Sequence, residues 1–289
     1  MSFYELGSDE LTISVNDLGA ELSSVRDRQG RELLWQGGEA WGRRAPILFP
    51  IVGRLPGNQL LSGGDSFRMT QHGFARDQPF VVEQSNESSC LFTLTDNPET
   101  MAQFPFPFRL QVRYTVIGDT VEVQTTVANP GESTLSASLG EHPGFQWPLP
   151  GAASRDGHTI EFAVDEPAPI RRIDANGLLA PEPFPTPVVG RTLALDDSLF
   201  ADDAVIFDQL SSRSVRYTAP GAPTISLAFP DFPLLGVWTN PPGRYVCIEP
   251  WFGMTSPAGF DGDFREKPGQ FALNPGESRV FVYRIAVTP

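Results

Sequence analysis

Lysine is almost absent from this chain of 289 residues, in which Lys267 is the only lysine among 21 basic side chains. Reactions that need a lysine amine, such as Schiff-base formation, therefore have almost no candidate residues. Basic charge as a whole is also scarce, because 35 acidic side chains give a formal net charge of −14. A nucleic acid or an anionic membrane needs a basic face that neutralises phosphates, so this balance argues against both as partners.

Cysteine and long apolar runs are scarce as well. Cys90 and Cys247 are the only cysteines, and both lie in apolar, strand-like runs, where buried free thiols are common. No run approaches the roughly 18–20 apolar residues that span a bilayer. The N-terminus has neither the basic nor the apolar region of a signal peptide. We therefore expect an unsecreted, cytoplasmic protein without a disulfide.

The chain is rich in short segments that alternate between apolar and polar residues, the pattern typical of strands. Residues 108–117 and 120–128 alternate around Gly118-Asp119, a two-residue loop that predicts a tight hairpin. Turn residues separate these segments, which predicts an all-β sandwich of mainly antiparallel strands. No shift in composition marks a boundary, so residues 1–289 are interpreted as a single domain. The other predicted strands are 11–15, 20–27, 80–84, 89–95, 134–139, 159–164, 215–218, 224–229, 234–239, 245–249 and 279–287.

Helix is expected in only one short segment. Asp96 or Asn97 can cap it, Pro98 suits its first turn, and it extends through Gln103. The following run of alternating phenylalanine and proline, residues 104–108, is interpreted as an apolar anchor of the crossing into the next strand.

The most constrained local sequence is Gly140-Glu141-His142-Pro143-Gly144-Phe145, which follows a strand-like run. Proline fixes its own φ, biases His142 towards extended backbone and offers no N–H to a strand ladder. We therefore expect the chain to turn here and to place the imidazole at a sheet edge or a cleft mouth. Because histidine titrates near neutral pH, His142 is taken as the centre of the site. The alternative is a histidine that only satisfies a turn hydrogen bond.

Two other polar groups stand at the ends of apolar sequence. Arg54 follows an apolar run that stops at Gly53, which suits a guanidinium that donates to ligand oxygens or, equally, a buried ion pair with a carboxylate. Glu249 closes an apolar, strand-like run. Burial there would raise its pKa and equip it as a general base, and the alternative is a glutamate that faces water.

Several motifs occur together along nearly the whole chain: Trp41-Gly42-Arg43-Arg44-Ala45-Pro46 leading to Gly53-Arg54-Leu55, Gln71-His72-Gly73-Phe74-Ala75-Arg76, the motif around His142, and Cys247-Ile248-Glu249-Pro250-Trp251. In order and spacing they resemble the aldose 1-epimerase (galactose mutarotase) family, in particular its LacX-like branch. The resemblance implies a galactose mutarotase-like β-supersandwich that interconverts the α and β anomers of a sugar without a cofactor. It places His142 on the general acid, Glu249 on the general base, and Arg54 and His72 on substrate-binding positions.

A fifth position of the family is an aspartate that binds sugar hydroxyls. Asp203 matches it best, and Asp202 or Asp208 could serve instead because the usual neighbouring residues are absent. Two departures lie beside the catalytic histidine, where Glu141 replaces a small residue and Gly144 replaces an alanine that this branch often has. A carboxylate there could raise the histidine pKa or restrict the pocket, so the resemblance leaves the preferred sugar open.

The chemistry of anomer exchange fits these residue types. One proton must reach the ring oxygen and one must leave the C1 hydroxyl, after which the hemiacetal opens, the C1–C2 bond rotates and the ring closes. Reference pKa values of about 6.5 for histidine and 4.3 for glutamate allow a protonated His142 and an ionised Glu249 to coexist near neutral pH. The three histidines show no close ligand spacing, which argues against a zinc site.

Two alternatives to a mutarotase of free sugars remain. A hexose-6-phosphate 1-epimerase would need a cationic phosphate clamp, for which Arg76, Arg43 and Arg44 are candidates. A non-catalytic carbohydrate-binding protein would need the pocket without the acid–base pair. In each case the expected partner is a small sugar, and the chain is expected to be a monomer or a homodimer. Four tryptophans could stack on a sugar face or belong to the core: Trp35, Trp41, Trp238 and Trp251.

Overall fold

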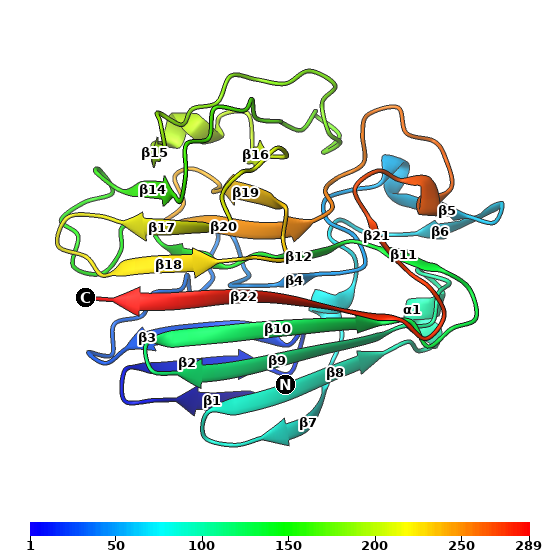
Figure 1. Cartoon of the computed structure of the whole chain (residues 1–289), viewed down its shortest axis with the longest axis horizontal. Coiled ribbons are helices and arrows are strands. Elements are labelled where there is room, and N and C mark those ends of the chain that lie inside the picture. Colours follow the sequence, from blue (N-terminus) through cyan, green and yellow to red (C-terminus); the bar gives the residue numbers. More distant parts are fainter.

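The computed structural model describes residues 1–289 and consists mainly of antiparallel strands (Figure 1). Its largest sheet has nine strands and forms one layer of a sandwich. The order across this sheet is β15 (Thr192–Ala194), β14 (Thr159–Phe162), β17 (Ser214–Thr218), β18 (Thr224–Ala228), β22 (Ser278–Thr288), β10 (Thr120–Ala128), β9 (Arg109–Ile117), β8 (Ser89–Thr95) and β7 (Val81–Ser85).

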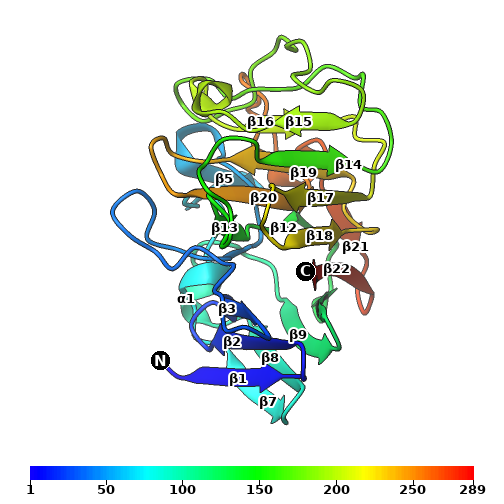
Figure 2. The same cartoon turned by 90° about the vertical axis from the view of Figure 1, so that its left-hand side faces the viewer.

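Smaller sheets complete the fold (Figure 2). A six-stranded sheet contains β16 (Val205–Phe207), β19 (Leu234–Trp238), β20 (Tyr245–Phe252), β12 (Leu139–Glu141) and β4 (Ile47–Leu48), with β13 (Gly144–Gln146) also paired to β20. A three-stranded sheet contains β1 (Phe3–Gly7), β2 (Leu11–Asn16) and β3 (Glu21–Asp27). Two further sheets have two strands each: β11 (Leu135–Ala137) pairs with β21 (Phe271–Leu273), and β5 (Gln59–Ser62) forms a hairpin with β6 (Asp65–Arg68). Helix is confined to α1 (Pro98–Met101) and to 3-10 turns at Pro56–Asn58, Ala75–Asp77, Asp197–Phe200 and Phe264–Glu266.

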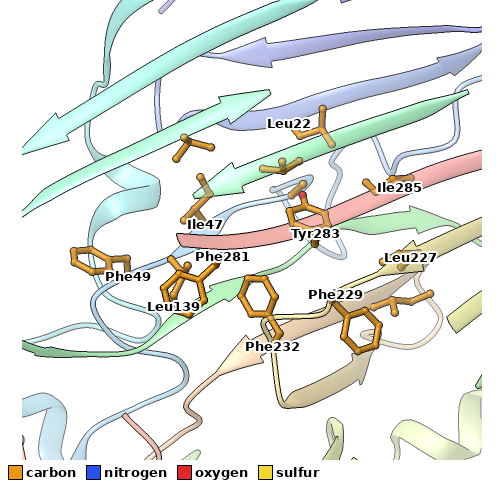
Figure 3. Packing of buried hydrophobic residues seen from close by; sticks show 14 of the residues in the cluster. Leu22, Ile47, Phe49, Leu139, Leu227, Phe229, Phe232, Phe281, Tyr283 and Ile285 are labelled. Atoms are coloured by element: carbon orange, nitrogen blue, oxygen red, sulfur yellow. The ribbon is translucent and has the colours of Figure 1, made fainter. Parts of the chain in front are cut away.

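One continuous apolar core joins the three larger sheets. Strand β22 contributes every second residue to it, including Phe281 and Tyr283, as its alternating sequence requires (Figure 3). These side chains pack beside Leu139 of β12 and Phe232, whose ring centroid lies 5.6 Å from that of Phe281. One face of the six-stranded sheet therefore packs against the core, and the opposite face is available for a functional site.

The local predictions that depend on alternation and turn chemistry are confirmed. Ile117 pairs with Thr120, so Gly118-Asp119 forms the predicted two-residue loop between β9 and β10. Asn97 caps α1, and its side chain accepts hydrogen bonds from the backbone of Glu99 and Thr100. All three phenylalanines of residues 104–108 are buried in the core. Both cysteines are buried free thiols. Among the helices, none is long and apolar enough to cross a membrane.

The predicted turn at Pro143 is wrong, and of the two positions predicted for His142, a sheet edge or a cleft mouth, the structure supports the cleft. Strands β12 and β13 lie on either side of this proline, and both pair with the same strand, β20. The backbone stays extended, and the Pro143 carbonyl still accepts a hydrogen bond from Ile248 N at 3.1 Å. The missing N–H therefore interrupts the ladder without redirecting the chain. The preceding histidine lies inside the six-stranded sheet and faces a pocket.

Candidate active site

All five predicted site residues line one pocket of about 1090 Å³, although they come from widely separated parts of the chain. His142 lies between β12 and β13, and Glu249 lies on β20. Arg54 and His72 lie on two neighbouring loops, and Asp203 follows a 3-10 turn. The six-stranded sheet forms the floor of this pocket because β20 and the β12–β13 segment both contribute to it.

Strand register brings His142 and Glu249 together. Gly140 pairs with Trp251, and Gly144 pairs with Cys247, so two steps from either pair place His142 opposite Glu249. The imidazole Nε2 lies 3.1 Å from the carboxylate Oε2. The side chains are only 8% and 2% exposed, which means that the contact is shielded from bulk water while both residues still line the pocket.

Burial determines the protonation of this pair. It lowers the pKa of His142 far below its usual value, and the charges of Arg76 and Arg43 act in the same direction. It raises the pKa of Glu249 well above its usual value, and the charge of Asp203 adds to this shift. Burial therefore opposes both protonation of His142 while Glu249 is already protonated and loss of the single proton that the pair holds. The pair holds one proton between Nε2 and Oε2 over a broad pH range, in one of two arrangements with the same net charge.

The loops that carry Arg54 and His72 fit together through two glycines. Gly53 has a φ of +73°, and a Cβ there would lie 2.3 Å from the Thr255 Cβ. Gly73 has a φ of +71°, and a Cβ there would lie 2.2 Å from the Phe49 carbonyl oxygen. Only glycine satisfies both the backbone conformation and the close approach. The glycines of the two sequence motifs therefore position the polar residues beside them.

The His72 imidazole is held by the neighbouring loop. Gly53 N donates to His72 Nδ1 at 3.1 Å, and His72 N donates to Gly53 O at 2.7 Å. Burial, together with the charge of Arg76, lowers the pKa of His72 well below its usual value. Since Nδ1 is an acceptor, the neutral ring carries its proton on Nε2, which lies 3.2 Å from the side-chain amide nitrogen of Gln71.

Arg54 forms no ion pair, so the alternative of a structural salt bridge does not hold. Its Nη2 donates to Gln71 Oε1 at 3.0 Å, and its backbone N donates to Thr255 Oγ1 at 2.9 Å. These contacts orient the guanidinium while leaving other N–H donors for a ligand. Gln71 also lies within the His72 motif, but nothing in the local pattern marked it as a support for Arg54.

The three candidate aspartates differ in whether they line the pocket. Asp208 pairs with Arg171 at 3.3 Å and does not line the pocket. Asp202 and Asp203 both line it. Asp203 has a φ of +64°, and its Oδ1 accepts a hydrogen bond from Ala204 N at 2.7 Å. The charge of Asp203 helps to raise the pKa of Glu249, an effect that Asp202 does not share.

An aromatic wall surrounds the imidazole of His142. The Trp41 ring stacks on it with centroids 5.0 Å apart and an interplanar angle of 28°, and Trp238 approaches edge-on at 6.0 Å. Gly144 makes room for this stack, because a Cβ there would lie 2.7 Å from Trp41 Cζ3. Trp251 also lines the pocket, whereas Trp35 does not. Trp41 thus contacts the catalytic candidate itself, a role that the sequence did not indicate.

Glu141 points away from the pocket. Its Oε1 accepts a hydrogen bond from Thr125 Oγ1 of β10 at 3.2 Å, between the two layers of the sandwich. Burial raises the pKa of Glu141 to about 8, so the carboxyl is mainly protonated at neutral pH. It neither restricts the pocket nor contributes to the pKa shift of His142.

The fold and the pocket define the class of the protein: a β-sandwich whose buried histidine–carboxylate pair opens onto a pocket with several polar side chains in its lining. The family profile of aldose 1-epimerase matches residues 2–286. The chain therefore belongs to the aldose 1-epimerase family.

Individual relatives agree with this assignment. Protein LacX (chromosomal) of Lactococcus lactis subsp. lactis is 31% identical over 295 residues, which cover 98% of each chain. The crystal structure of a galactose mutarotase related enzyme from Lactobacillus acidophilus has a TM-score of 0.91 at 30% identity and covers 100% of this chain and 98% of that one. A galactose mutarotase-like protein from Lactobacillus casei has a TM-score of 0.92 at 27% identity, with 99% and 100% of the two chains covered. The fold is accordingly galactose mutarotase-like, as predicted.

Proposed function

We propose that this protein is a mutarotase that interconverts the α and β anomers of an unphosphorylated hexose by acid–base catalysis at His142 and Glu249. The observation that carries the proposal is the 3.1 Å contact between Nε2 and Oε2 at the floor of the pocket. Ring opening needs an acid and a base that are both within hydrogen-bond reach of one hemiacetal. Membership of the aldose 1-epimerase family supports the same reaction.

The shared proton makes both catalytic groups available at once. When it moves from Glu249 to His142, the carboxylate becomes a base and the imidazolium becomes an acid, with no exchange of protons with solvent. Glu249 removes the proton of the C1 hydroxyl, His142 protonates the ring oxygen, and the bond between C1 and the ring oxygen breaks. Rotation about C1–C2 and the reverse transfers then close the ring on the other face and restore the pair.

The remaining polar residues suit the binding of sugar hydroxyls. Arg54 and the Nε2–H of His72 are donors, and Asp203 is an acceptor, so the set matches hydroxyl groups that both donate and accept. Trp41 stacks on His142, and the negative face of its ring stabilises the imidazolium that forms during proton transfer.

A neutral substrate fits the charge of the pocket better than a phosphorylated one. Three aspartates line the pocket, Asp174, Asp202 and Asp203, and their negative charges would repel a phosphate dianion. One observation favours a hexose 6-phosphate as the second candidate: Arg76 also lines the pocket. Its Nη2 already donates to Gln71 O at 2.6 Å, which reduces its capacity as a phosphate clamp.

The test is anomer exchange measured by NMR on a panel of free hexoses and hexose 6-phosphates. Glu249→Gln and His142→Asn should each lower the rate by a factor of order 10²–10⁴, and the double variant should be little worse than the worse single variant. Glu141→Gln is the matched control, because it alters the adjacent buried carboxyl that faces away from the pocket. It should exchange sugars at the wild-type rate.

Three outcomes would reject parts of this proposal. Wild-type rates in folded, sugar-binding forms of both site variants would remove His142 and Glu249 from the mechanism. A kcat/KM for hexose 6-phosphates at least tenfold above that for every free sugar would replace the neutral substrate. Sugar binding by the wild type without exchange faster than buffer would make the chain a non-catalytic carbohydrate-binding protein.

A further inference from the structure

A buried thiol, that of Cys247, lies directly beneath the pocket floor. Cys247 and Glu249 are two residues apart on β20 and therefore share one face of the strand. His142 lies opposite Glu249, and Gly144 pairs with Cys247. As a result, the histidine nitrogen, the cysteine sulfur and a carboxylate oxygen all lie within 4.8 Å of one another. All three residues are buried.

From this cluster we propose that His142, Cys247 and Glu249 form a binding site for a zinc-like divalent cation, and that occupation of the site blocks the acid–base pair. Imidazole nitrogen, thiolate sulfur and carboxylate oxygen are the three ligand types that zinc uses in proteins. Tetrahedral bonds of about 2.0–2.3 Å place ligand atoms roughly 3.3–3.7 Å apart, so side-chain movements of about 1 Å suffice. The fourth position faces the pocket and can hold a water molecule.

Charge balance favours such an exchange. The His142–Glu249 pair holds one proton and the Cys247 thiol holds another. When a divalent cation binds, both protons leave, and the ligands become a neutral imidazole, a thiolate and a carboxylate. Two positive charges depart and two arrive, so the buried site keeps the same net charge. An ion bound without this release would add uncompensated charge to a buried site, which is costly.

Access and selectivity follow from the positions of the three residues. His142 and Glu249 line the pocket, whereas Cys247 lies beneath its surface and is fully buried. An ion therefore enters from the pocket that the sugar would occupy. A magnesium or calcium ion prefers oxygen ligands, and the single carboxylate offers too few of them. Thiolate and imidazole favour zinc and cobalt instead.

Cobalt absorption gives a direct test on the full-length protein freed of metal by EDTA and dialysis. A cobalt ion bound to a thiolate shows a sulfur-to-metal charge-transfer band in the near ultraviolet. Wild type should develop this band on titration with Co²⁺, and Zn²⁺ should abolish it. Cys247→Ser and Cys247→Ala should lack the band, whereas Cys90→Ser, which changes the other buried thiol, should retain it. His142→Asn keeps the thiol and should bind Co²⁺ at least tenfold more weakly.

Zinc should also slow anomer exchange by wild type, and EDTA should reverse the effect. The inference is overturned if wild type gives no charge-transfer band, if Cys247→Ala keeps the band, or if Cys90→Ser alone loses it. Its failure differs from a failure of the proposed function. Sugar exchange without a cobalt band removes only the metal site, and a cobalt band without sugar exchange removes only the catalytic role.

Discussion

The shared proton of His142 and Glu249 predicts the pH dependence of the reaction. The proposed mechanism requires the form of the pair with one proton, so kcat/KM should follow a bell. Burial lowers the pKa of His142 and raises that of Glu249, which moves the acidic limb below the usual histidine pKa of about 6.5 and the alkaline limb above the usual glutamate pKa of about 4.3. The limbs belong to the pair as a whole.

Initial rates of anomer exchange, corrected for the spontaneous reaction, would measure this profile. In Glu249→Gln only the His142 imidazole can titrate, so any residual activity should show a single limb that falls as pH rises instead of a bell. An acidic limb near 6.5 in wild type would contradict the buried pair, because His142 would then titrate like a histidine in water.

The contact between Trp41 and Gly144 gives a second prediction at the scale of single residues. In Gly144→Ala the new methyl group would meet Trp41 Cζ3 at 2.7 Å and push the indole from its stack on His142. Overpacking of this kind should lower the free energy of unfolding by about 1–3 kcal/mol, and kcat should fall because the imidazolium loses its aromatic support. Gly42→Ala is the matched control, since a Cβ there meets no atom within 4 Å. Equal unfolding midpoints and kcat for the two variants would refute this role of Trp41.

Among the elements, β20 best shows how one strand serves both structure and site. Val246 and Ile248 face the main core, while Cys247, Glu249 and Trp251 alternate with them towards the pocket side. The two-residue period of a strand produces this division directly. The strand is therefore fixed by its packed face, and its polar face is held rigidly in place.

The paired loops make a prediction at the same scale. Gly53→Ala combines a positive φ with a contact of 2.3 Å to the Thr255 Cβ, whereas Gly63→Ala has a φ of +61° and no atom within 4 Å. The control should lose about 1–2 kcal/mol of stability from backbone strain alone, and Gly53→Ala should lose about 1–3 kcal/mol more. Because Gly53 also holds the ring of His72, only Gly53→Ala should weaken sugar binding. Urea unfolding and sugar titration on both variants would decide, and matching losses would exclude the close approach as the cause.

At the scale of the whole molecule, the buried carboxyl of Glu141 between the two layers makes the free energy of unfolding depend on pH. Its pKa rises from 4.5 in the ordinary state to about 8 in the fold because the carboxyl is buried. Between these values the folded state keeps a proton that the unfolded state has lost. The contribution to stability is thus complete below pH 4.5 and decreases as pH rises towards 8, by roughly 2–5 kcal/mol in total.

Glu141→Gln removes this titration while keeping a neutral, hydrogen-bonding side chain. Urea unfolding from pH 4.5 to 8.5 should show that wild type loses stability relative to the variant as pH rises. Comparing the two proteins cancels the contributions of other buried groups. Parallel curves would mean that Glu141 is ionised in the folded state.

The sequence by itself determined those features that depend on neighbouring residues. Alternation predicted the β9–β10 hairpin, and the capping residues before Pro98 predicted α1, because each rests on propensity and spacing within a few residues. The ordered set of motifs along the chain indicated the family. The turn predicted at Pro143 failed because it, too, rests on a few neighbouring residues. Local chemistry shows that proline breaks a ladder, but it does not show that β20 pairs on both sides of the break.

Only the tertiary structure decided which of the possible roles each polar residue takes. The register of β12 and β13 on β20 placed His142 within hydrogen-bond distance of Glu249, so that they can share a proton. The contact of Thr255 with Gly53 and Arg54 fixed the position of Arg54. Packing between the two layers directed Glu141 away from the pocket. These are contacts between residues far apart in the chain, so their distances and burial depend on how whole sheets pack. Burial and distance, in turn, control pKa values and hydrogen bonds, which is why the chemistry of the site emerges only from the complete fold.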